Sequence, residues 1–220
     1  MTMRISFEQE LKQLNEDLIE MGRNVADSIQ QTMKAFESND RALAMKIIQN
    51  DRAINDMERS IESQCLNLML RQQPVAKDLR HISMALKVVT DLERIGDHAA
   101  DIAELVLHLD DKKSETMIQI LPNMVESVQE MLQSAIEAFI KKDILLAKKV
   151  EKQDDIIDDY FNQAKNEIVQ MLRTVQGNED KMVDLLMIAK YLERIGDHAV
   201  NVCEWTEFHD TGEVKNHRIL

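Results

Sequence analysis

The sequence contains few residues that interrupt helices. Only 5 glycines and 2 prolines occur among its 220 residues. Leu, Met, Ala, Glu, Gln, Lys and Ile, which suit long helices, fill much of the remainder. A sheet protein of this length would need many more turn-forming residues between its strands. The composition therefore predicts an all-α protein made of long helices.

Cysteines and long apolar runs are also scarce. Cys65 and Cys203 lie in helical patterns without a CxxC spacing, which indicates neither a disulfide framework nor a thiolate metal site. No apolar run reaches the roughly 18 to 20 residues that a bilayer-spanning helix needs. The first residues, MTMRISFEQELKQ, lack the apolar stretch of a signal peptide. We therefore expect a protein of the reducing cytoplasm, without direct membrane insertion.

Positive charge is scarce relative to negative charge. The chain has 27 basic and 40 acidic residues, for a net charge of −13, and such a chain repels the phosphate backbone of nucleic acids. Catalytic signatures are absent as well: there is no glycine-rich phosphate loop, no GxSxG, no HExxH and no Glu-x-x-His of the di-iron oxidases. We expect neither a nucleic-acid partner nor an enzymatic activity.

Apolar residues recur every three or four positions in six long segments, the pattern of amphipathic helices. Short polar turns between such helices favour antiparallel bundles. The expected helices are 7–36, a second ending before Pro74, a third from Pro74 to about Leu109, a fourth opening at Pro122, a fifth from the turn at 141–143 to about Gln176, and a sixth before the aperiodic tail that starts at Phe208.

The second half of the chain repeats the first. The octapeptide Leu-Glu-Arg-Ile-Gly-Asp-His-Ala occurs at 92–99 and again at 192–199, exactly one hundred positions apart, whereas Asp51 and Asp154 match at an offset of 103. Such identity indicates tandem duplication of a three-helix unit, with three residues lost from the second copy. We expect two three-helix bundles, 1–112 and 113–220, related by pseudo-twofold symmetry.

Acidic residues form a stripe on the third and sixth helices. At about 100° per residue, the acids at 93, 97, 101 and 104 fall within about 80° of one another. The sixth helix carries Glu193, Asp197 and Glu204, with Asn201 at the remaining place. Acids four residues apart repel each other. A bound cation would offset this repulsion.

Further acids lie on the second and fifth helices. Asp154 and Asp158 are four residues apart, and Asp51 and Asn55 occupy the matching places. Hard oxygen ligands on facing helices are how helical bundles hold metal ions. The sequence predicts a multinuclear, oxygen-rich metal site in each half, and Asn55 makes the two sites unequal.

Each feature of this stripe has a competing interpretation. The acids lie roughly opposite the apolar positions of their own helix, as on a solvated face, although repetition of the same octapeptide favours a more specific role. Gly96 and Gly196 indicate close approach of a backbone or ligand, or simple helix packing. His98 and His198 point about 100° away from the acids, which favours structural hydrogen bonds over metal ligation.

The stretch Arg-Gln-Gln-Pro-Val-Ala-Lys-Asp-Leu-Arg at 71–80 and the two octapeptides resemble the PhoU family, whose signature is a repeated E(D)xxxD motif. The resemblance covers nearly the whole chain. It implies two three-helix bundles in a cytoplasmic, often dimeric protein without catalytic activity. In some members iron or zinc clusters occupy the E(D)xxxD carboxylates. Although Asn55 departs from the family pattern, the resemblance therefore implies a set of metal ligands in this chain: Asp51, Glu93, Asp97, Asp154, Asp158, Glu193 and Asp197.

The resemblance also implies a function and partners. Members of the family act between the ATP-binding subunit of the Pst phosphate transporter and the PhoR sensor kinase. They hold down phosphate uptake and the phosphate-starvation (Pho) response when phosphate is plentiful. The alternatives from the residues alone are a carboxylate-bridged, metal-dependent enzyme and a metal-free helical scaffold.

Overall fold

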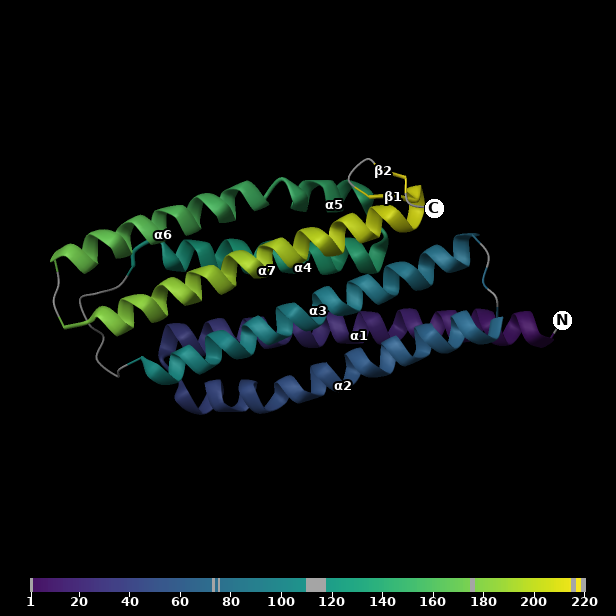
Figure 1. Cartoon of the computed structure of the whole chain (residues 1–220), viewed down its shortest axis with the longest axis horizontal. Coiled ribbons are helices and arrows are strands. Elements are labelled where there is room, and N and C mark those ends of the chain that lie inside the picture. Colours follow the sequence, from purple (N-terminus) through teal and green to yellow (C-terminus); the bar gives the residue numbers. More distant parts are fainter. Residues whose placement is uncertain are drawn as a thin grey trace.

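The computed structural model describes residues 2–72, 74, 76–109, 118–174, 177–214 and 217–218, which form an elongated bundle of antiparallel helices (Figure 1). This confirms the all-α class. The helices are α1 Thr2–Ser38, α2 Arg41–Gln72, α3 Ala76–His108, α4 Leu121–Lys141, α5 Ile144–Glu151, α6 Asp154–Thr174 and α7 Glu179–Thr211, followed by the paired two-residue strands β1 Glu213–Val214 and β2 His217–Arg218.

The predicted fifth helix is interrupted, so it forms both α5 and α6. The backbone N–H of Gln153 donates to the carbonyl of Val150 at 2.8 Å, and a new helix starts at Asp154. Acidic side chains in a first turn interact favourably with the helix dipole. Asp154 and Asp155 therefore stabilise this second start, and the prediction of one continuous helix was wrong here.

The turns that end α1 and α4 share one backbone design. Asp40 and Asp143 each accept a hydrogen bond of 3.0 Å from the backbone N–H three residues on, as N-cap residues do. The residue before each cap, Asn39 and Lys142, has a left-handed backbone with φ of 51° and 55°. The internal repeat thus extends to the conformation of the turns.

The two halves share one core. Helices α3 and α7 lie side by side through the centre of the molecule, with α1 and α2 on one side and α4 to α6 on the other (Figure 1). Leu92 and Ile95 of α3 belong to the same buried cluster as Leu192 and Ile195 of α7. The predicted boundary at residue 112 falls in 110–117, outside the described residues.

Two helix ends differ from the prediction. Helix α3 begins at Ala76 rather than at Pro74, and α7 continues through Phe208, which is 1% exposed, to Thr211. Pro122 does lie in the first turn of α4, where its missing N–H leaves no hydrogen bond unmade. No helix in the described ranges is long and apolar enough to cross a membrane.

Candidate functional site

Two glycines let the helix pairs approach closely. A Cβ atom added at Gly96 of α3 would lie 3.0 Å from Cγ2 of Ile54 on α2, and one at Gly196 of α7 would lie 3.4 Å from Cγ2 of Ile157 on α6. At Gly96 the near neighbour is the Ile54 side chain alone, so helix packing accounts for this glycine. At Gly196 the Asp154 Oδ1 atom of the carboxylate cluster also lies near, at 3.5 Å from the added Cβ atom. This packing brings the carboxylates of each helix pair into proximity.

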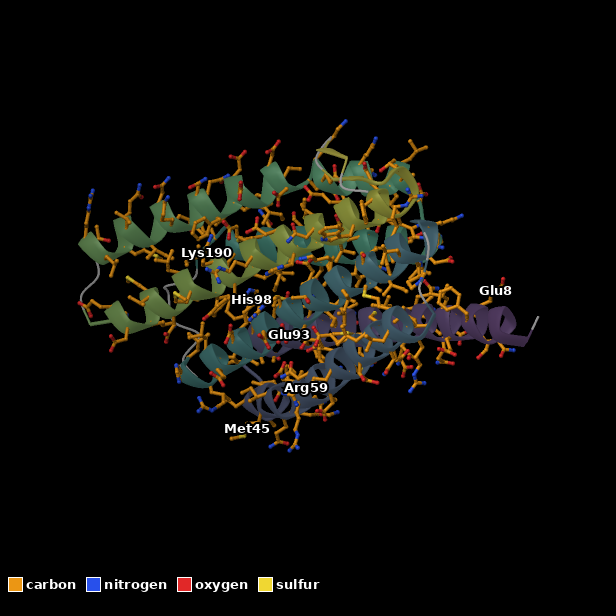
Figure 2. The ribbon with its side chains drawn as sticks, turned by 45° about the vertical axis from the view of Figure 1, so that its right-hand side comes forward. Glu8, Met45, Arg59, Glu93, His98 and Lys190 are labelled. Carbon is orange, nitrogen blue, oxygen red and sulfur yellow. The ribbon has the colours of Figure 1, made fainter. Side chains whose placement is uncertain are left out.

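The first cluster consists of Asp51, Asn55 and Glu58 on α2 with Glu93 and Asp97 on α3. Asn55 Nδ2 donates to Asp51 Oδ2 at 2.9 Å. Figure 2 labels Glu93 on the side of α3 that faces α2. Arg94 of the octapeptide contacts both α3 carboxylates: its Nε lies 3.5 Å from Glu93 Oε2 and its Nη1 lies 3.3 Å from Asp97 Oδ2. The guanidinium group thus neutralises part of their charge.

The carboxylates of the first cluster repel one another across the helix interface. The Glu93 side chain is only 15% exposed, and burial, followed by the charges of Asp97 and Glu58, raises its pKa to about 7. Burial and the charge of Asp97 also raise the pKa of Asp51. A side chain as buried as Glu93 does not belong to a freely solvated face.

Two oxygens of the first cluster have no hydrogen-bond partner. Asp51 Oδ1 and Asn55 Oδ1 are both buried and unpaired, a state that is costly for a polar atom. Among the residues that the structure describes, no three His, Cys, Asp or Glu side chains are gathered tightly enough to hold a metal ion as they stand. The cluster nevertheless offers the all-oxygen donor set that hard cations prefer.

The second cluster consists of Asp154 and Asp158 on α6 with Glu193 and Asp197 on α7. Burial, followed by the charges of Asp197 and Asp158, raises the pKa of Asp154 to about 6. Here Lys190 supplies a cation: its Nζ donates to both carboxylate oxygens of Glu193, at 2.6 Å for Oε1. The second cluster is therefore partly neutralised by the protein itself.

Glu58 was not among the predicted site residues. It lies seven residues after Asp51, two turns along the same face of α2, and its charge contributes to the raised pKa of Glu93. Phe161 occupies the matching place in the second half, where the Lys190 ammonium lies 5.2 Å from the centre of its ring. The first cluster thus replaces the carboxylate missing at Asn55 with one from the next turn.

His98 lies in the interface between α3 and α7 (Figure 2), and the centre of its ring is 5.7 Å from that of His198, the other octapeptide histidine. His198 Nδ1 is 2.8 Å from Asp91 Oδ1, and Asn201 Nδ2 donates to the same oxygen at 2.9 Å. His98 Nδ1 is 3.4 Å from Asp101 Oδ2. These contacts are the structural hydrogen bonds that the helix geometry indicated.

The acidic stripe predicted on the third helix therefore divides among three environments. Glu93 and Asp97 join the first cluster, Asp101 contacts His98, and Glu104 is exposed to solvent. On α7 the amide of Asn201 crosses to Asp91 instead of extending the second cluster. Only the two acids within each octapeptide belong to the candidate sites.

The chain is similar to known proteins over nearly its whole length. The family model of the PhoU domain matches residues 18–106 and 121–206. The "phosphate-specific transport system accessory protein PhoU homolog" of Clostridium acetobutylicum is 37% identical over 97% of either chain. Homolog 1 of Thermotoga maritima is 34% identical over 97% of this chain and 92% of its own.

Solved structures agree with the sequence comparison. The crystal structure of the phosphate transport system regulatory protein PhoU from Streptococcus pneumoniae has a TM-score of 0.87 at 30% identity, covering 94% of this chain and 98% of that one. PhoU from Pseudomonas aeruginosa has a TM-score of 0.89 at 32% identity, covering 94% of this chain and 100% of its own. The chain therefore belongs to the PhoU family.

Proposed function

We propose that this chain is a negative regulator of phosphate uptake and of the phosphate-starvation response. In this role it acts in the cytoplasm as an adaptor between the ATP-binding subunit of the Pst transporter and the PhoR sensor kinase. The observation that carries the proposal is similarity over nearly the full length to proteins named as accessory or regulatory proteins of phosphate transport.

Deletion of the gene tests the regulatory role. Phosphate-starvation genes should then be expressed in high phosphate, and a plasmid copy of the intact gene should restore their repression. Pull-down of the transporter subunit and of the kinase with the tagged chain tests the adaptor role separately. Unchanged expression of the starvation genes after deletion would contradict the regulatory proposal, whatever the pull-down shows.

A homodimer is part of the same proposal, and it rests on the family resemblance. Light scattering on the purified full chain distinguishes the two states, because a monomer has a mass of 25.4 kDa and a dimer twice that mass. A monomer at all accessible concentrations would contradict the dimer and leave the regulatory role to the genetic test.

We further propose that the two clusters bind metal, with iron or zinc as the candidates. Asp51, Glu93 and Asp97 would hold it in the first cluster, with Glu58 as an added ligand. Asp154, Asp158, Glu193 and Asp197 would hold it in the second. The unpaired oxygens of Asp51 and Asn55 and the mutual repulsion of the carboxylates support this proposal, because a cation would relieve both. Bound metal would tie α2 to α3 and α6 to α7.

Metal analysis of protein purified without chelator tests the clusters. The variants Glu93→Gln and Glu193→Gln should each contain less metal than the wild type, because each loses an anionic ligand. Glu104→Gln removes the same charge from an exposed position on α3 and should leave the metal content unchanged. Negligible metal in all four proteins would contradict the metal sites and favour the metal-free scaffold.

A further inference from the structure

A cavity of about 360 Å³ lies at one end of the molecule, away from both carboxylate clusters. Its walls come from the beginnings of α1 and α3, the residue after α4, and the last turn of α7. In Figure 1 this is the end that carries the N-terminus and the paired strands, and Figure 2 labels Glu8 there. Its volume is in the range of sites for small ligands.

Basic side chains from four separate segments line this cavity. Three are lysines and two are histidines: Lys12 of α1, Lys77 and His81 of α3, Lys142 after α4, and His209 of α7. The chain as a whole has a net charge of −13. A group of basic side chains in so acidic a protein indicates a site for an anion. The first turn of α3, which lines the cavity, adds the positive end of a helix dipole.

The two histidines are held against each other. The ring of His81 meets the ring of His209 edge to face at 5.1 Å between centres, and His209 is 7% exposed. Burial, then the positive charges of His209 and Lys142, lower the pKa of His81 to about 4. At neutral pH the His81 ring therefore keeps one nitrogen that accepts a hydrogen bond.

The cavity also contains hydrogen-bond acceptors with negative charge. Asp78 and Glu8 line it beside the lysines, and carboxylates repel an anion that carries no hydrogen. The same carboxylates can accept a hydrogen bond from an oxyanion that still carries a hydrogen atom, and so can the neutral His81 ring. Sulfate has no such hydrogen at neutral pH, and a phosphomonoester has largely lost it because its second pKa is about 6.

We propose that this cavity binds inorganic hydrogenphosphate, with Lys77 and Lys142 neutralising its charge and His81, Asp78 or Glu8 accepting its hydrogen. Lys12 also lines the cavity, but its ammonium is paired with Glu16 at 3.4 Å. The inference does not rest on the proposed regulatory function, because it concerns binding by the purified chain alone.

The internal repeat gives an independent argument for a specific role. The first half has Asn39 where the second has Lys142, and Leu109 where the second has His209. Asn39 and Lys142 share the same left-handed backbone, so the fold of the turn does not require a lysine. Lys142 and His209 are therefore additions to the duplicated framework rather than parts of it.

The repeat also supplies test variants that suit the fold. Lys142→Asn and His209→Leu each introduce the residue that the other half carries at the matched position. Lys141→Asn removes the same charge from the neighbouring residue, which pairs with Glu137 and does not line the cavity. Circular dichroism and thermal melting of each variant verify folding before any binding measurement.

Binding is measured on the full chain by calorimetry and by the imidazole NMR signals of His81 and His209 during titration with sodium phosphate. Sodium sulfate at equal ionic strength and glycerol 3-phosphate are titrated in parallel. Phosphate should shift both imidazole signals saturably and bind more tightly than either competitor. Lys142→Asn should weaken phosphate binding about tenfold, the loss expected for one charge-assisted contact, whereas Lys141→Asn should not. His209→Leu removes the ring that packs against His81 and should also weaken binding.

The remaining outcomes each decide the proposal. Tighter binding of glycerol 3-phosphate would overturn inorganic phosphate as the ligand and assign the cavity to phosphate esters. Equal responses to phosphate and sulfate would show that the shifts reflect ionic strength, and would also overturn the proposal. Equal loss in Lys141→Asn, or no saturable shift of either imidazole signal in millimolar phosphate, would also overturn it.

Discussion

Gly96 and Gly196 occupy matched positions with different amounts of space. The added Cβ atom would lie 3.0 and 3.1 Å from two carbons of Ile54 in the first case, but no closer than 3.4 Å to Ile157 in the second. Ile54 is 5% exposed, and its β-branched side chain has little rotamer freedom. Gly96→Ala should therefore destabilise the protein by about 1–2 kcal/mol despite its gain in helix propensity.

Gly196→Ala is the matched comparison. With ordinary contact distances, the gain in helix propensity should dominate, so this variant should be neutral or more stable by up to about 1 kcal/mol. Urea unfolding of both variants measures the difference. Equal changes in the free energy of unfolding at the two glycines would contradict the packing argument. If the double variant Gly96→Ala/Ile54→Ala loses less stability than the two single variants together, the result would support it.

Lys190 should make the second cluster bind metal less well than the first. Its ammonium group already neutralises Glu193, whereas Thr90, at the matching place, makes its hydrogen bond to the Leu86 carbonyl of its own helix. If the clusters bind metal as proposed, Lys190→Thr should raise the metal content of the second cluster, and Thr90→Lys should lower that of the first. Lys190→Thr is also combined with Glu93→Gln, and Thr90→Lys with Glu193→Gln, so that the cluster that is not under test loses its glutamate. Elemental analysis of these proteins then assigns the change in metal content to one cluster.

The sequence predicted which carboxylates lie together in these clusters better than it predicted their individual contacts. Asp51 and Glu93 could be assigned because their helices and faces follow from periodicity. Glu58 carried a usable signal, since it shares a face with Asp51 two turns away. The role of Lys190 could not be predicted, because a lysine three residues before a glutamate occurs on many solvated helices and only burial of Glu193 makes the pair significant.

Asp91 connects α3 to α7 through one buried carboxylate oxygen. It is 9% exposed and binds both His198 and Asn201 of the other half. Asp91→Leu would leave these two polar groups without their partner, and should destabilise the protein by about 2–3 kcal/mol. Asp101→Leu is the control: the Asp101 side chain is 41% exposed and contacts His98 within its own helix, so its loss should cost less than about 1 kcal/mol.

Guanidinium unfolding of the two variants provides the comparison. Equal destabilisation by Asp91→Leu and Asp101→Leu would show that the bond between α3 and α7 contributes no more than a local contact within α3.

His81, which lies near the start of α3 and contacts the end of α7, should make the stability of the protein depend on pH. Unfolded His81 takes up a proton below about 6.5, whereas the folded ring does so only below about 4. The unfolded state therefore binds more protons between these values, and this contribution to stability is complete above pH 6.5 and lost as the pH falls. It should amount to about 1–2 kcal/mol between pH 7 and pH 5.

His81→Asn should remove this pH dependence, because the amide does not titrate. His108→Asn, at the exposed end of α3, should retain it. Both comparisons keep the other charged groups of the cavity unchanged: Glu8, Lys12, Lys77, Asp78, Lys142 and His209. Thermal melting at the two pH values measures the slope, and identical slopes in wild type and His81→Asn would contradict the assignment.

At the level of elements, the sequence predicted turns more reliably than interruptions. Asp40 and Asp143 were recognisable as turn residues, and both act as caps. The break between α5 and α6 was hidden because apolar periodicity continues through Lys152 and Gln153, and neither residue is a helix breaker. Asp154, one of the two acids that stabilise the start of α6, was assigned to a metal site alone.

The whole molecule is organised about the contact of its two octapeptide helices. His98 and His198 occupy matched positions and their rings lie 5.7 Å apart, which places the pseudo-twofold axis between them. Duplication predicted this symmetry. The sequence could not predict which helices meet, because α3 and α7 each have an apolar stripe that would also suit other partners.

This symmetry predicts that the first half alone can pair with a second copy of itself. A fragment of residues 1–112 would leave the α7-facing side of α3 uncovered, and another α3 presents the same octapeptide. In such a dimer each Asp91 would meet His98 and Asp101 of the other copy, in place of His198 and Asn201. Two carboxylates would then face each other twice, which disfavours the dimer.

Asp101→Asn should relieve this repulsion, because it recreates the amide that Asn201 provides in the intact chain. We expect the fragment carrying this change to dimerise about thirtyfold more tightly than the unchanged fragment, since two repulsive pairs of about 1 kcal/mol each are relieved. Sedimentation equilibrium measures both constants. Glu104→Gln removes the same charge from an exposed position of α3; if it tightened the dimer as much as Asp101→Asn, net charge rather than the matched contact with Asp91 would govern the pairing.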